Sequence, residues 1–169
     1  LAKLTHSNGE WIAYEYTVDG YVAKLTSSTG AVTEYSYENG NLVSSTGLLG
    51  DTINYSYSDV YEHFLTAITG TTGNQQHFSY GNNGLLEKNW LQAADSTATR
   101  SECMLSYGDD GGITVTDQYG ASSTYYYNLS GKVAKAVDVN GNVLRYAYDS
   151  AGNLIAQTDQ LGNITSYAY

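Results

Sequence analysis

A Tyr-x-Tyr pair that returns about every 21 residues is the feature that most constrains this fold. Six copies are complete and two are degenerate, Phe78/Tyr80 and Leu105/Tyr107. A fixed period of this length predicts one supersecondary unit stacked many times, because each unit alone buries too little surface to be stable. The tyrosines of this predicted structural ladder are Tyr14, Tyr16, Tyr35, Tyr37, Tyr55, Tyr57, Tyr80, Tyr107, Tyr125, Tyr127, Tyr146, Tyr148, Tyr167 and Tyr169.

Two series of glycines run in phase with the tyrosine pairs. One glycine stands seven residues before the second aromatic position in seven of the eight copies, and Arg100 takes its place in the remaining copy. A second glycine usually follows the pair by three or four residues. Glycine readily adopts the positive φ that tight turns require, so both series predict chain reversals. The first series comprises Gly9, Gly30, Gly50, Gly73, Gly120, Gly141 and Gly162.

The last copy shows the expected unit most clearly. Residues 163–169 alternate between two faces, with Thr165, Tyr167 and Tyr169 on one of them. A second apolar stretch at 154–158 precedes them across a turn at 159–163, which predicts a β-hairpin. The 169 residues accommodate about eight such hairpins, and the absence of proline suits central strands. We therefore predict an all-β array of about eight 21-residue antiparallel hairpins in one spiralling or stacked sheet, spanning residues 1–169.

Composition excludes several classes of function. Lys+Arg 7 against Asp+Glu 17 gives a formal charge of −10, and the basic residues are scattered, so neither nucleic acid nor an anionic membrane is an expected partner. No long apolar run predicts membrane insertion. Cys103 is the single cysteine, which excludes an internal disulfide framework. Because the sequence begins with Leu1, we expect it to be an excerpt of a longer chain or assembly.

The repeat is least regular at two insertions, near residues 58–66 and 89–100. Long loops on repeat scaffolds often bind ligands, so a possible ligand patch comprises Trp90, Tyr61, His63 and Arg100. The simpler interpretation is that both loops are tolerated excursions, because loop insertions cost little free energy. The residue between the two aromatic positions is serine or alanine in six copies, and Glu15 and Tyr126 occupy this position in the other two.

Short acidic motifs are interpreted as turns rather than as catalytic or metal sites. Asp138-Val-Asn-Gly-Asn142 carries oxygen ligands at alternate positions but lacks the later Glu of a calcium-binding EF-hand, so weak calcium binding stays a minor alternative. The acidic pair in residues 108–111 falls at an expected turn. The histidines are too far apart in sequence for a zinc pair, and no nucleophile motif is present. We therefore predict no catalytic residues, no metal and no cofactor.

The pattern of glycine, Tyr-x-Tyr, an acid or amide, and a second glycine resembles the YD repeats of the RHS family. The nearest match is Gly141-Asn-Val-Leu-Arg-Tyr-Ala-Tyr-Asp-Ser-Ala-Gly-Asn-Leu154, and the resemblance extends along the whole chain. It implies a β-sheet strip that winds into a spiral or hollow shell, found in bacterial surface and secreted proteins, toxin-complex shells and teneurin-like adhesion proteins. The self-cleavage motifs of such shells contain Asp-Pro, and a chain with no proline carries none of them.

Three hypotheses of function follow. The first is a non-catalytic extracellular scaffold whose hairpins stack end to end into a filament or extended strip, with further copies or continuation of the same chain as partner. The second is a wall segment of an RHS-type shell that encloses a toxin. The third is a cell-surface adhesin that binds carbohydrate through exposed aromatic side chains such as Trp11 or Trp90.

Overall fold

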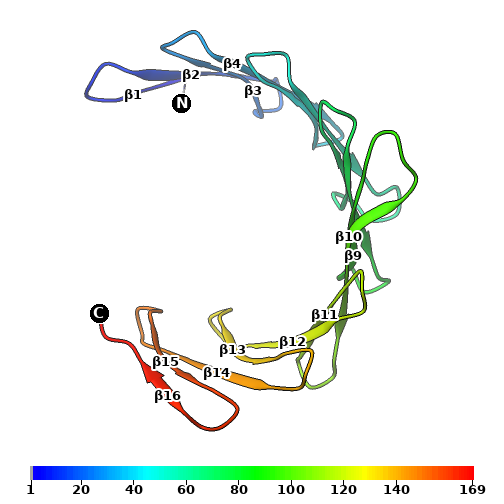
Figure 1. The fold of residues 1–169 in the computed structure, drawn as a ribbon. Coiled ribbons are helices and arrows are strands. Elements are labelled where there is room, and N and C mark those ends of the chain that lie inside the picture. Colours follow the sequence, from blue (N-terminus) through cyan, green and yellow to red (C-terminus); the bar gives the residue numbers. More distant parts are fainter. Residues whose placement is uncertain (1) are drawn as a thin grey trace. The chain divides into compact units, whose positions relative to one another are not determined.

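The computed structural model describes residues 2–169, and every regular element in this range is a β-strand. The strands divide between two compact units, which are described separately. The first unit comprises the chain up to Ser79 together with Trp90–Thr99, and the second comprises Tyr80–Asn89 and Arg100–Tyr169. Figure 1 shows the strands joined by tight reversals in both units. The prediction of an all-β, antiparallel fold is confirmed.

In the first unit each strand pairs antiparallel with the next along the chain, from β1 to β8. The bounds are β1 Lys3–Thr5, β2 Trp11–Tyr16, β3 Val22–Ser27, β4 Val32–Glu38, β5 Asn41–Thr46, β6 Thr52–Tyr57, β7 Leu65–Thr69 and β8 Gln75–Tyr80. β9, Leu86–Gln92, has residues in both units, and so do β8, through Tyr80, and β10, Thr99–Tyr107, through Thr99.

The second unit repeats the same meander from β10 to β16. Its strands are β10 Thr99–Tyr107, β11 Ile113–Asp117, β12 Ser122–Tyr127, β13 Val133–Val137, β14 Val143–Tyr148, β15 Leu154–Thr158 and β16 Ile164–Ser166.

One sequence-based strand is shorter than expected. Residues 163–169 were predicted to be extended throughout, but β16 ends at Ser166. The register of β14 gives the reason, because its Tyr146 and Tyr148 pair with the following strand β15 rather than with the preceding one. Tyr167 N still donates to Ile155 O at 3.0 Å. No strand follows β16 within the described residues, so Tyr167 and Tyr169 lack the second neighbouring strand that β15 provides for Tyr146 and Tyr148.

Each unit is a single layer of sheet, and this limits burial. Ala67, at 8% exposure, is the only hydrophobic residue among residues 2–169 that is buried, and no large side chain among them is fully enclosed. Tyrosines and aliphatic side chains share one face, as when Tyr14 pairs with Leu25 and Leu25 with Thr33. The other face carries cross-strand hydroxyl pairs such as Thr114–Thr124, at 2.8 Å. Stability therefore rests on cross-strand contacts and half-buried aromatic rings rather than on a central core.

Candidate functional site

The tyrosine face carries a hydrogen-bonding relay that ties successive hairpins together. Tyr16 pairs with Val22 across a register shift, and the hydroxyl of Tyr37 donates to the carbonyl oxygen of Val22 at 3.0 Å. Tyr37 in turn pairs with Leu42 across the next shift, and the Tyr57 hydroxyl donates to Leu42 O at 2.9 Å. In both cases the second tyrosine of a pair binds the residue that faces the second tyrosine of the preceding pair.

The second unit contains the same arrangement. Tyr127 pairs with Val133 across a register shift, and the Tyr148 hydroxyl donates to Val133 O at 2.9 Å. The Tyr107 hydroxyl reaches Leu86 O at 2.8 Å. A bulge interrupts the ladder locally, and a phenol that donates to a carbonyl at the bulge supplies a hydrogen bond there. The relay is therefore a structural site in which the tyrosine hydroxyl, and not only the ring, has a defined partner.

The tyrosines of the predicted ladder differ in their surroundings. Those of β2 through β14 lie in the C-terminal half of an even-numbered strand, whereas Tyr167 and Tyr169 follow β16. Burial raises the pKa of the Tyr37 phenol, with smaller contributions from neighbouring Tyr35 and Tyr21, and it also raises the pKa of Tyr57. Tyr169 is 83% exposed, so the last tyrosine of the ladder is not covered by neighbouring side chains as Tyr37 and Tyr57 are.

Turns at both ends of the strands in the second unit are built alike. In residues 138–142, Asn142 N donates to Asp138 Oδ1 at 2.8 Å and Asn142 Nδ2 donates to Asp138 Oδ2 at the same distance. Gly141 completes the turn with a φ of 79°. These donors hold the pKa of Asp138 below its usual value. The same two hydrogen bonds, which we call the Asp–Asn clasp, join Asp149 to Asn153 and Asp159 to Asn163. The carboxylate oxygens that suggested a calcium loop therefore face N–H donors of their own turn.

The other six glycines of the first series occupy equivalent turns. Gly9, Gly30, Gly50, Gly73, Gly120 and Gly162 have φ values between 80° and 92°. Each donates its N–H to the carbonyl three residues earlier, as Gly162 does to Asp159 at 3.1 Å. The left-handed φ is disfavoured for residues with a Cβ, so these positions require glycine or a tolerant substitute.

The four residues of the predicted ligand patch lie in separate environments. Trp90 stacks on His77 with ring centroids 4.9 Å apart, and Tyr61 packs against Phe64 at 5.2 Å. His63 Nδ1 lies 2.6 Å from Asn41 Oδ1. Arg100 belongs to the second unit and is exposed, whereas the other three belong to the first. A shared ligand patch of these four residues therefore stays a prediction.

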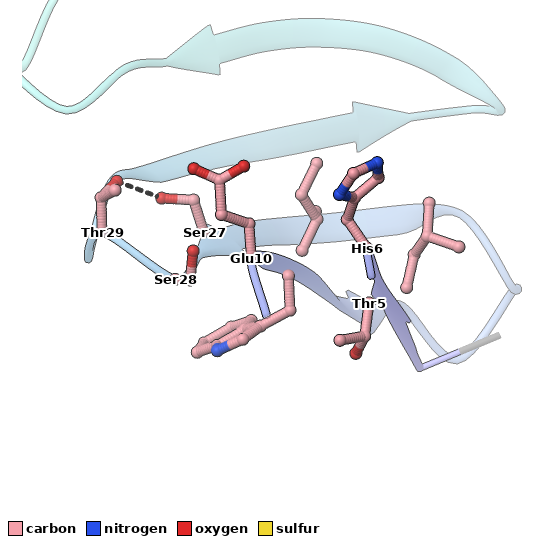
Figure 2. A pocket seen from close by; sticks show the side chains of 9 residues that line it. Thr5, His6, Glu10, Ser27, Ser28 and Thr29 are labelled. Atoms are coloured by element: carbon pink, nitrogen blue, oxygen red, sulfur yellow. Dashed lines mark hydrogen bonds between the residues drawn. The ribbon is translucent and has the colours of Figure 1, made fainter. Parts of the chain in front are cut away.

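A shallow hollow of about 440 Å³ lies beside β1, β2 and β3. Trp11 and Ile12 contribute apolar surface, and Figure 2 shows His6 and Glu10 projecting on the same side of these strands. Lys3 Nζ lies 4.3 Å from the centre of the Trp11 ring, so this indole is engaged by a cation. The hollow is therefore lined by both apolar and polar side chains.

Neither a metal cluster nor a membrane-spanning helix is found in the described part of the chain. Residues 2–169 contain no group of three His, Cys, Asp or Glu side chains placed to bind one ion. The same residues contain no helix long and apolar enough to cross a bilayer.

Sequence reasoning missed the bulges and therefore the partners of the tyrosine hydroxyls. The accepting residues Val22, Leu42, Leu86 and Val133 each stand two positions after a glycine of the second series. This Gly-x-aliphatic pattern is visible in the sequence and is shared by all four acceptors, although Ile113 and Leu154 also follow it.

Comparison with known proteins places these features in context. The model described as RHS Repeat matches residues 127–159 and 148–169. The C-terminal part of the chain is therefore similar in sequence to RHS repeats, as the tyrosine and glycine pattern predicts. No curated protein matches the chain by sequence.

Two solved structures share the fold. The first is a chain of the Photorhabdus luminescens Tc holotoxin pore carrying the TccC3-D651A mutation, with a TM-score of 0.68 and 13% identity over 95% of this chain and 10% of that one. The second is a porin-like protein from Bacteroides uniformis ATCC 8492, with a TM-score of 0.50 and 14% identity over 98% of this chain and 90% of that one. The present chain thus spans about a tenth of the Tc chain that it matches.

Proposed function

We propose that this chain is a segment of the wall of an RHS-type shell and acts as a non-catalytic structural scaffold. The observation that carries the proposal is the likeness of 95% of the chain to a Tc holotoxin chain at a TM-score of 0.68. A wall segment must be stable as a single layer of sheet. The hydroxyl hydrogen bonds from Tyr37 to Val22 and from Tyr57 to Leu42 support such a layer because they connect successive hairpins. In this role residues 1–169 are part of one longer repeat array that is secreted or displayed on the cell surface.

A filament assembled by stacking of hairpins is the principal competing proposal. The two assemblies differ in their particles, since a shell is closed and hollow whereas a stacked filament is elongated with a spacing of about 4.8 Å along its axis. Cryo-electron microscopy of the full-length native polypeptide is therefore the decisive experiment. Discrete hollow particles support the shell wall, and elongated particles with the strand repeat contradict it.

Carbohydrate binding is a second candidate function, favoured by the hollow beside Trp11. Trp11→Ala removes its aromatic wall, and Trp90→Ala serves as a matched control because Trp90 stacks on His77 away from the hollow-lining residues. The proposal predicts glycan-array binding that is lost in the first variant and retained in the second. An array without any signal from the native chain removes carbohydrate binding as a function.

A further inference from the structure

Two equivalent rows of side chains on the face opposite the tyrosines differ in charge. In the first unit the register aligns Glu15 with Lys24 and Lys24 with Glu34, so a lysine lies between two acids. In the second unit the same repeat positions hold Tyr126, Lys135 and Arg145. We call these the paired row and the cation row. The cation row replaces one acid by a phenol and the other by a guanidinium.

The lysine of the paired row is neutralised by its neighbour. Lys24 Nζ lies 3.6 Å from Glu34 Oε1. Arg145 stands where Glu34 does, directly opposite Lys135. Within residues 2–169 no carboxylate lies within ion-pair distance of the exposed Arg145 guanidinium. Like charges directly across a strand pair destabilise a sheet, and an anion bound between them would remove this repulsion.

The ammonium of Lys135 is held in position by a chain of contacts. Gly112 N donates to Asp110 Oδ1 at 3.0 Å, and the Tyr126 hydroxyl donates to Asp110 Oδ2 at 2.8 Å. Lys135 Nζ then lies 3.4 Å from the centre of the Tyr126 ring, in a cation–π contact. Both oxygens of Asp110 are therefore engaged by hydrogen-bond donors of Gly112 and Tyr126.

Gly112 is required for this arrangement. A Cβ at Gly112 would lie 3.0 Å from Tyr126 Cε1 and 2.9 Å from Thr124 Cγ2. Gly112 is buried under these side chains, and the ring can lie flat over it because it has no side chain. The turn, the phenol and the lysine thus form one ordered unit, and its lysine pairs with Arg145 across β13 and β14.

We propose that Lys135 and Arg145 form a binding site for a single oxyanion group, a carboxylate or a phosphate, on the face opposite the tyrosine ladder. A guanidinium binds planar and tetrahedral oxyanions through two parallel N–H donors, and the adjacent ammonium adds a point charge. The chain as a whole has a formal charge of −10 and repels extended polyanions, so the site is suited to one group rather than to a nucleic acid.

The test uses the two arginines of the chain, Arg100 and Arg145, as separate reporters. The purified chain is titrated at constant ionic strength with inorganic phosphate and, separately, with N-acetylglutamate, while the side-chain Nε–Hε signals are followed by NMR. We expect the Arg145 signal to move to saturation and the Arg100 signal to move little. Saturation by phosphate alone assigns the site to tetrahedral oxyanions, saturation by N-acetylglutamate alone assigns it to carboxylates, and both together assign it to either group.

Matched variants distinguish binding at Lys135 and Arg145 from a general effect of positive charge. Lys135→Gln and Arg145→Gln are expected to weaken binding about tenfold each, because each removes one charge-assisted interaction. Lys24→Gln in the paired row is expected to leave binding unchanged. Arg145→Glu recreates the lysine–acid pair that Lys24 and Glu34 form and is expected to abolish binding, with backbone amide spectra as the check on folding. Parallel, unsaturated shifts of both arginines in both titrations, or equal loss of binding in Lys24→Gln, overturn the proposal.

Discussion

The Tyr37 hydroxyl donates a hydrogen bond of 3.0 Å to the carbonyl oxygen of Val22, the residue that pairs with Tyr16 across a bulge. One side chain thereby connects two consecutive copies of the repeat. The bond gives a physical reason for tyrosine, rather than phenylalanine, at the second position of the pair. It also makes the repeat period a structural requirement, because the hydroxyl must reach a bulge at a fixed distance along the chain.

Loss of this hydroxyl is expected to destabilise the first unit. Tyr37→Phe keeps the half-buried ring but removes the donor to Val22 O, and a hydrogen bond of this kind contributes about 1 kcal/mol. Urea denaturation monitored by circular dichroism measures the change. Tyr169→Phe is the matched control, because Tyr169 is 83% exposed and lies beyond β16. Equal stability of the two variants would count against the relay.

Alkaline pH is expected to weaken the same face. Burial raises the pKa of Tyr37 and Tyr57 above the ordinary value of 10.0. The folded state then resists ionisation that the unfolded chain undergoes, so this stability is present below pH 10 and is lost as pH rises through the folded-state values. Thermal unfolding measured from pH 8 to 12 tests the sign. The double variant Tyr37→Phe/Tyr57→Phe should show a flatter decline than the native chain.

Acid is expected to weaken the turns. The side-chain N–H of Asn153 and its backbone N–H lower the pKa of Asp149, and the corresponding asparagines act on Asp138 and Asp159. A lowered folded-state pKa stabilises the fold above the ordinary value of 3.8, and this stability is lost as pH falls through the folded-state values. Unfolding curves from pH 7 to 2 measure it. Asp149→Ala should be less stable at neutral pH and lose less on acidification, and a parallel decline contradicts the clasp.

Substitutions at two turn glycines distinguish the cost of backbone strain from the cost of a steric clash. Gly141 has a φ of 79° with open space around an added Cβ, so Gly141→Ala should cost about 1–2 kcal/mol from the left-handed conformation alone. Gly73 has a φ of 81°, but a Cβ there would lie 2.8 Å from Ala94 Cβ. Gly73→Ala is therefore expected to cost more. Denaturant titration measures the free energy of unfolding of both variants. An equal loss of stability would show that the loop at residues 93–98 moves away from the added Cβ without a free-energy penalty.

The like-charge pair of the cation row predicts a variant that gains stability in the absence of an anion. Arg145→Glu replaces repulsion from Lys135 by attraction across the same register position, and an exposed pair of this kind contributes a few tenths of a kcal/mol. The melting temperature in low-salt buffer without phosphate should rise. Lys24→Glu, which breaks the ion pair with Glu34, should shift it downward. A lower melting temperature for Arg145→Glu contradicts the repulsion.

The sequence by itself determined the fold class, because tyrosine alternation and glycine spacing are local signals. Period two in residues such as Tyr146 and Tyr148 specifies a strand, and Gly141 marks a reversal whatever lies around it. The same local pattern led to the YD-repeat resemblance. The matches to the RHS model at residues 127–159 and 148–169 support that resemblance in the region where the pattern is cleanest.

The tertiary structure alone decided which strand each tyrosine pairs with and where the bulges fall. Register depends on contacts between residues about ten positions apart, and the sequence does not state whether Tyr148 faces the strand before or after it. For this reason β16 was predicted too long, and the Val22 acceptor of Tyr37 was not foreseen. The cation row has the same origin, since Lys135 and Arg145 become neighbours only when β13 and β14 pair.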